Sequence, residues 1–104
     1  MKPETEQLPP VTPGQLLLEE FLQPLGITQY KLSKAIGVPE SRIYGIVRGQ
    51  RAITADTDLR LCRYFGLSNG YWLRAQMLHD IEVASRDLGP TLVQIKPIGS
   101  NCAS

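Results

Sequence analysis

The sequence has few of the residues that build metal sites or disulfide frameworks, and it has no long apolar run. Among its 104 residues are two cysteines, Cys62 and Cys102, and one histidine, His79. No histidine or cysteine stands near either cysteine at metal-ligand spacing, and two cysteines are too few for a disulfide framework. No segment approaches the roughly 18 apolar residues of a membrane helix, and the polar first residues lack the apolar segment of a secretory signal. We therefore expect no metal, no cofactor and a soluble, cytoplasmic domain.

No group of residues has the spacing of a catalytic centre. His79 is followed directly by Asp80, and neighbouring residues on a helix point in different directions, so the pair does not form a catalytic dyad by spacing. Cys62 stands where a helix needs a small apolar residue, and no base is placed to activate Cys102. No glycine-rich phosphate loop is present. These absences predict that the protein is not an enzyme.

Length and composition predict one small domain with flexible ends. Hydrophobic residues make up 42% of the chain and charged residues 20%, which is enough apolar material for a modest core. We expect a flexible arm over residues 1–12, where prolines lie among polar residues, and a folded domain over 13–89. Residues 90–104 alternate weakly before Pro97, so they form either a short edge strand or a disordered tail.

Apolar spacing and helix-end signals predict five helices and an all-α bundle. The predicted helices run from Pro13 to about Gln23, from Gln29 to Ile36, from Glu40 to about Arg48, from the Thr54 cap to Phe65, and from the Ser68 cap to just before Gly89.

Within the first helix, Leu17, Phe21 and Leu25 recur every four residues and are expected to face the core. Pro24 disfavours helical geometry at Gln23, so the helix should end there. Farther along, carboxylates fall in the first turn of the fourth helix, at Asp56 and Asp58, where the helix dipole stabilises them.

The segment from Thr28 to Gly49 resembles the DNA-binding helix-turn-helix of phage-repressor type. Two short helices that cross near a right angle need a tight turn, and Gly37 can take the positive φ that such a turn requires. Ser33 supplies a small residue where the helices approach, and Val38 turns inward. A small shared core should hold the crossing angle, and its members are Leu32, Ile36, Ile43 and Ile46.

With Ile43 and Ile46 inward, the third helix should present a polar face suited to the major groove of DNA. Arg48 can donate two hydrogen bonds to a guanine, and Glu40 can accept one from a cytosine. Gly45 leaves room for the backbone or for a thymine methyl group to approach; alternatively, it merely weakens the helix. The predicted base contacts are Glu40, Ser41, Tyr44, Gly45 and Arg48, of which Ser41 and Tyr44 suit bases or phosphates.

Charge is concentrated on this segment although the whole chain carries only +1. Residues 28–51 hold five basic side chains and one acid, a net +4, so the remainder carries −3. A positive segment in a nearly neutral protein favours contact with phosphate, although ordinary solvated surface charges are the alternative. The predicted phosphate contacts are Gln29, Lys34, Arg42 and Arg51.

The chain is also similar to HigA-type antitoxins over about residues 8–89, and this resemblance is most specific outside the motif. The segments that carry this resemblance are Pro13–Gly26, Arg48–Leu61, Phe65–Leu73 and Trp72–Asp80. The resemblance implies a five-helix, phage-repressor-like fold and a dimeric repressor of its own operon that neutralises a small ribonuclease toxin. Two alternatives stay open: a transcriptional regulator without a toxin, and a helical protein-interaction module.

The fifth helix has more apolar residues than one small core needs. We expect the surplus, including Trp72, Leu78 and Ile81, to form a two-fold dimer interface, because related repressors bind half-sites about 34 Å apart as dimers. The alternative is that this helix simply forms the centre of the core.

Overall fold

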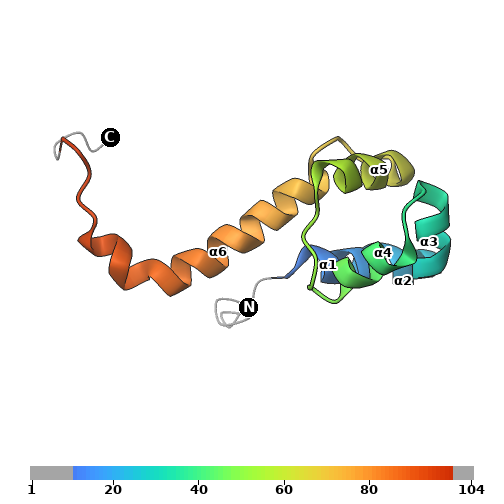
Figure 1. The fold of residues 1–104 in the computed structure, drawn as a ribbon, viewed down its shortest axis with the longest axis horizontal. Coiled ribbons are helices and arrows are strands. Elements are labelled where there is room, and N and C mark those ends of the chain that lie inside the picture. Colours follow the sequence, from blue (N-terminus) through green and yellow to red (C-terminus); the bar gives the residue numbers. More distant parts are fainter. Residues whose placement is uncertain (1–10, 100–104) are drawn as a thin grey trace.

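The computed structural model describes residues 11–99 and contains five helices, with no strand among those residues (Figure 1). The predicted all-α fold is therefore confirmed. The first helix is continuous through α1 (Pro13–Leu16), the π-helical η2 (Leu17–Leu22) and α2 (Gln23–Leu25). The others are α3 (Gln29–Ile36), α4 (Glu40–Val47), α5 (Ala55–Phe65) and α6 (Tyr71–Gln94). Most of the predicted arm, at residues 1–10, and the end of the predicted tail, with Cys102, lie outside the described residues.

The π-helical segment changes which side of the first helix faces the core. Its i+5 to i hydrogen bonds place residues five apart, rather than four apart, on one face. Leu17 and Leu22 are accordingly buried, whereas Phe21 is half-buried and Leu25 is 59% exposed. Phe21 still packs against the core, so the predicted spacing of four residues holds from Leu17 to Phe21 and is wrong at Leu25.

The same segment explains why the first helix continues past the predicted end at Gln23. In a regular α-helix the ring of Pro24 would collide with the carbonyl four residues earlier. Here the wider π turn comes directly before Pro24, and the N–H of Gln23 donates to the carbonyl of Leu18 five residues back. The helix ends only at Gly26, which has a left-handed φ of 67°.

The middle helix ends are as predicted, but both ends of α6 differ from the prediction. Thr28 and Thr54 accept hydrogen bonds from backbone N–H groups as N-caps of α3 and α5. α6 is capped by Gly70, not Ser68, and it continues through Pro90 to Gln94. Pro90 is tolerated because the carbonyl that it leaves without a donor belongs to the exposed Arg86, where water can solvate it. Helix, rather than an edge strand, therefore occupies residues 91–94, and residues 95–99 form neither helix nor strand.

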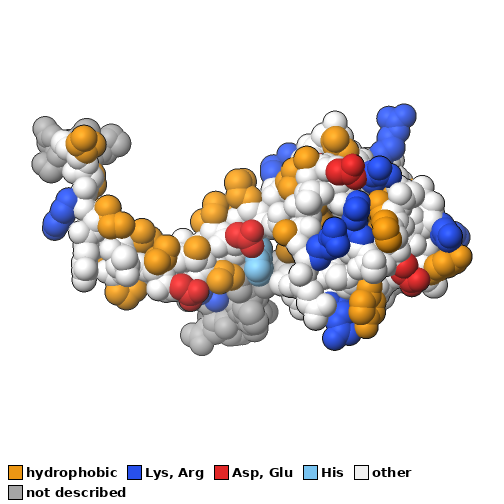
Figure 2. Space-filling view, viewed as in Figure 1, with side chains coloured by type: hydrophobic (Ala, Val, Ile, Leu, Met, Phe, Trp, Pro, Cys, Tyr) orange, Lys and Arg blue, Asp and Glu red, His pale blue; other side chains and the backbone are white. Residues whose placement is uncertain are grey.

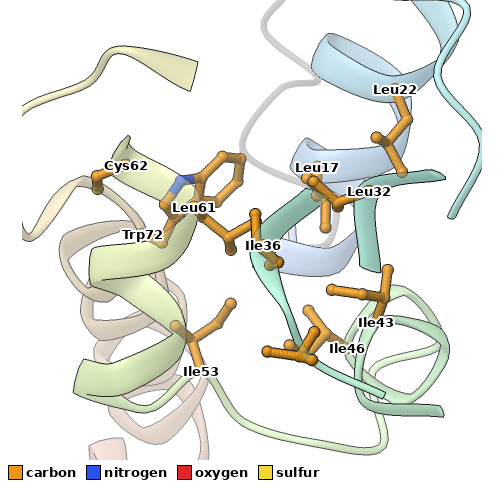
Figure 3. Close-up of a cluster of buried hydrophobic side chains, with 11 residues drawn as sticks. Leu17, Leu22, Leu32, Ile36, Ile43, Ile46, Ile53, Leu61, Cys62 and Trp72 are labelled. Atoms are coloured by element: carbon orange, nitrogen blue, oxygen red, sulfur yellow. The ribbon is translucent and has the colours of Figure 1, made fainter. Parts of the chain in front are cut away.

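The core lies where all five helices meet, and Trp72 closes it from the start of α6 (Figure 3). α1 approaches α4 so closely that a Cβ at Gly14 would lie 2.0 Å from the carbonyl oxygen of Ile46, so only glycine fits there. The buried apolar side chains are Leu17, Leu22, Leu32, Ile36, Val38, Ile43, Ile46, Ile53, Leu61, Cys62 and Trp72.

A buried carboxylate, that of Asp58 on α5, holds the N-terminus of α6. One oxygen of Asp58 accepts hydrogen bonds from the N–H groups of Trp72 and Leu73, at 2.8 and 3.1 Å. The other oxygen accepts from the N–H of Gly70 at 2.7 Å. Asp58 is 1% exposed, so these donors replace the water that the carboxylate loses on folding. The sequence predicts that the dipole of α5 stabilises the Asp58 carboxylate. In the structure, the hydrogen bonds from the N–H groups at the start of α6 are the larger stabilising contribution.

The second half of α6 projects away from the compact body (Figure 1). The radius of gyration is 17.3 Å, against about 13 Å for a compact chain of 100 residues. Large apolar side chains along this projection are exposed, among them Leu78, Ile81, Leu88 and Leu92.

We predict that Asp58→Ala lowers the free energy of unfolding by about 2–4 kcal/mol, because three backbone N–H groups lose their buried acceptor. Urea denaturation measures the change. Asp87→Ala, at an exposed acid in the projecting part of α6, is the control and should change stability by less than about 0.5 kcal/mol. Equal losses in the two variants would show that Asp58 does not anchor α6.

Candidate nucleic-acid interface

The α3–turn–α4 unit has the predicted geometry. Gly37 takes a left-handed φ of 73° at the C-terminus of α3, and Val38 is buried directly after it. Ser33, where the two helices approach, is 2% exposed and donates from its hydroxyl to the carbonyl of Tyr30. The predicted shared core is confirmed: Leu32, Ile36, Ile43 and Ile46 are all buried.

This core turns the predicted polar face of α4 toward solvent. Glu40, Ser41 and Arg48 are exposed, and Tyr44 is 50% exposed. Gly45 is half-buried on the same face. The structure thus brings the five predicted base-contact residues together on α4.

Tyr44 and Arg48 form a pair one helical turn apart on this face. Nη1 of Arg48 donates to the hydroxyl of Tyr44 at 2.7 Å, and the guanidinium carbon lies 5.1 Å from the centre of the ring. The ring restricts the guanidinium to one side of α4 while other N–H groups remain for an acceptor. A guanidinium held in this way suits two-point recognition of a guanine.

The absent side chain of Gly45 makes room for Arg51 of the following loop. A Cβ at Gly45 would lie 3.2 Å from the Cβ of Arg51. The backbone N–H groups of Gln50 and Arg51 both donate to the Gly45 carbonyl, so the loop folds back onto the end of α4. Gly45 therefore places a second arginine next to the exposed face of α4, a role that the sequence alone did not indicate.

The other predicted phosphate contacts differ in their surroundings. Lys34 is exposed, with its ammonium 5.3 Å from the ring of Tyr30. Gln29 is half-buried at the start of α3, and its side-chain oxygen has no hydrogen-bond partner among residues 11–99. Arg42 has a side chain only 28% exposed, and its Nη1 lies 3.8 Å from Asp56. Asp56 thus partly neutralises Arg42, while Lys34 and Arg51 stay exposed.

Basic side chains gather over the compact body that holds α3, α4 and α5, whereas apolar side chains follow the projecting part of α6 (Figure 2). Of the basic residues in the segment 28–51, Lys31, Lys34, Arg48 and Arg51 are exposed on this body. The body and the projection offer chemically different surfaces.

The predicted dimer residues separate into two groups. Trp72 is fully buried inside the protomer, so its assignment to a dimer interface is wrong: its indole packs against the rings of Phe21, Phe65 and Tyr71. Leu78 and Ile81, in contrast, are 65% and 55% exposed on the projecting part of α6.

His79 and Asp80 do contact each other, contrary to the argument from helix spacing. Nδ1 of His79 lies 3.0 Å from the carboxylate of Asp80. They line a cleft of about 220 Å³ together with Gln76, residues 12–14 and the loop after α4. Gln76 joins this loop to α6, since its side-chain amide both accepts from and donates to the backbone of Ile53.

Among residues 11–99, no three His, Cys, Asp or Glu side chains gather as metal ligands would. No helix of the described chain is both long enough and apolar enough to cross a membrane.

Sequence analysis missed one residue beside the candidate interface, Arg60 on α5. Its ion pair with Asp56 has the i, i+4 spacing that the sequence shows. Its hydrogen bond to the carbonyl of Ile36, at the end of α3, crosses 24 positions and leaves no local signal.

Comparisons with known proteins identify the family. The helix-turn-helix family profile matches residues 18–72. Virulence-associated protein I of Dichelobacter nodosus is 48% identical over 81 residues, covering 78% of this chain and 75% of the relative. Antitoxin HigA-1 of Vibrio cholerae is 33% identical over 72 residues, or 69% of this chain and 68% of the relative.

A solved structure of Pseudomonas aeruginosa antitoxin HigA with the higBA promoter superposes with a TM-score of 0.79. It is 34% identical and covers 86% of this chain and 98% of that protein. This chain therefore belongs to the helix-turn-helix family of phage-repressor type, and its predicted resemblance to HigA-type antitoxins is confirmed.

Proposed function

We propose that the protein is a sequence-specific DNA-binding repressor that acts as the antitoxin of a toxin–antitoxin pair. The observation that carries the proposal is the Tyr44–Arg48 pair on an exposed polar helix, within a basic helix-turn-helix unit of a HigA-type chain. The P. aeruginosa HigA structure contains the promoter of its own operon. By analogy, this protein represses the operon that encodes it.

In this proposal, α4 lies in the major groove and the surrounding basic groups hold the phosphates. Arg48 contacts a guanine, and Glu40, Ser41 and Tyr44 contact neighbouring bases. Gly45 contributes by admitting Arg51 rather than by contacting a base itself. Lys34, Arg51 and Gln29 contact phosphate, with a smaller contribution from Arg42 because Asp56 lies beside it.

The projecting part of α6 pairs with the same helix of a second copy. Four exposed apolar residues, Leu78, Ile81, Leu88 and Leu92, together with Ser85 between them, follow an alternating spacing of three and four, which is the pattern of a two-helix seam. The charged neighbours Glu82 and Arg86 pair with each other beside the seam at 3.0 Å. A two-fold dimer then presents two copies of α4 to a pseudo-palindromic operator. The seam consists of Leu78, Ile81, Ser85, Leu88 and Leu92.

Toxin neutralisation rests on membership of the HigA-type antitoxins, and the proposed partner is a small ribonuclease encoded beside this gene. The role is one of binding and not of catalysis, and it takes place in the cytoplasm, where the operon is. The alternatives are a regulator without a toxin and a protein-interaction module that does not recognise a DNA sequence.

Substitution of Arg48 tests sequence recognition. We predict that Arg48→Ala weakens binding to the promoter upstream of this gene by about 1–3 kcal/mol and barely changes binding to unrelated DNA. Arg51→Ala should weaken both and reduce the slope of log affinity against log salt by about one. Fluorescence anisotropy with labelled duplexes gives both numbers, and Arg63→Ala, at an exposed arginine of α5, is the control. Unchanged promoter binding by Arg48→Ala would overturn the recognition-helix assignment.

Substitution in the seam tests the dimer. We predict that Leu88→Glu makes the protein monomeric, because two buried carboxylates would face an apolar partner. Analytical ultracentrifugation measures the mass, and circular dichroism checks that the body stays folded. Val83→Glu is the matched control, since Val83 lies on the opposite side of α6 from Ser85. A Leu88→Glu variant that remains dimeric would exclude this seam.

Co-expression tests the antitoxin role. We predict that a short reading frame next to this gene stops growth when expressed alone, that co-expression of this protein restores growth, and that the two products co-purify. A neighbouring gene that is harmless alone would favour the regulator without a toxin.

A further inference from the structure

Arg60 links α5 to the turn between α3 and α4. Its Nη1 donates to the carbonyl of Ile36 at 2.7 Å and approaches the carbonyl of Gly37 at 3.4 Å. These carbonyls stand at the C-terminus of α3, where helix geometry leaves them without intrahelical donors and with partial negative charge. The guanidinium of Arg60 therefore supplies the hydrogen-bond donor that these carbonyls of the turn lack.

Asp56 fixes the direction of this guanidinium. Its carboxylate accepts from Nε of Arg60 at 2.6 Å, one helical turn earlier on α5. The same oxygen lies 3.8 Å from Nη1 of Arg42 on α4. One carboxylate thus stands between the arginine that contacts the turn and an arginine on the recognition helix.

Glycine at position 37 leaves room for this contact, in addition to allowing the left-handed backbone conformation. A Cβ there would lie 3.3 Å from Nη1 of Arg60, which is closer than most side-chain contacts allow. The turn and the arginine are therefore fitted to each other across 23 positions of sequence.

We infer that Arg60 is a positioning residue for DNA recognition: with Asp56, it holds the turn between α3 and α4 in place against α5, and it does not itself contact DNA. This inference rests on the proposed DNA-binding function. The apolar core sets which faces of α3 and α4 meet, and the Arg60 contacts restrict the turn where α4 begins. Because base contacts need accurate placement of α4, loosening this turn lowers affinity for the operator more than affinity for unrelated DNA.

The test compares full-length Arg60→Ala with Arg63→Ala, which removes an exposed arginine that makes no hydrogen bond or ion pair within residues 11–99. We expect Arg60→Ala to lower promoter affinity about tenfold, to lower affinity for an unrelated duplex less, and to keep the wild-type salt slope. Faster amide hydrogen exchange at Gly37 and Val38 should accompany it. Arg60→Lys should restore part of the loss, since an ammonium can reach one carbonyl but cannot also bind Asp56 in fork geometry.

Other results would overturn the inference. A salt slope reduced by about one would show that Arg60 contacts phosphate directly. Unchanged promoter affinity, or unchanged exchange at Gly37 and Val38, would show that the turn does not depend on it. If Arg60→Ala does not fold, Arg60→Lys supports the inference when it gives the same changes in weaker form and opposes it when it does not. Failure of the wild-type protein to bind the promoter would overturn the proposed function, while the exchange measurement would still test the role of Arg60.

Discussion

The structure depends on one buried anion. Asp58 places a carboxylate inside the protein, where it is 1% exposed, and the backbone N–H groups that begin α6 replace the bulk water that it loses. Because α6 starts at Tyr71, its first N–H groups have no intrahelical acceptor and are free to donate to Asp58, so the carboxylate fixes where this helix begins. The same contacts bring Trp72 into the core, where it packs against Phe21 and Phe65. The first residues of α6 thus both donate hydrogen bonds to the Asp58 carboxylate and bury the indole of Trp72 in the core.

Anchoring at one end lets the rest of α6 project. Its first turn is tied to α5 through Asp58, and its second turn is tied to the loop before α5 through Gln76. Beyond that point its apolar side chains are exposed, so they remain for a partner rather than for the core of the protomer. The fold consequently separates a basic body from an apolar projection, and each surface suits a different kind of partner.

The recognition helix is supported by three contacts, two of which come from residues far away in the sequence. Gly14 admits the carbonyl of Ile46 against α1, Arg51 lies across Gly45, and Arg60 contacts the turn that precedes α4. Helices of eight residues are too short to be stable alone, so their orientation must come from such contacts. The polar face and the shared core of the motif could be predicted from the sequence, because they follow from spacing within twenty residues. The contacts of Gly14 and Arg60 could not be predicted, because they join residues more than twenty positions apart.

The sequence by itself determined the five helices, the turn at Gly37, the exposed face of α4 and the concentration of positive charge around it. These properties are local: they follow from side-chain periodicity, caps and the conformational freedom of glycine. Tertiary structure decided that Trp72 is core rather than interface, that the first helix widens into a π turn before Pro24, and that α6 continues through Pro90. In each case the surroundings of the residue decided the outcome. Apolar side chains enclose the indole of Trp72, and the wider π turn accommodates the ring of Pro24. Near Pro90, solvent satisfies the carbonyl that the proline leaves without a donor.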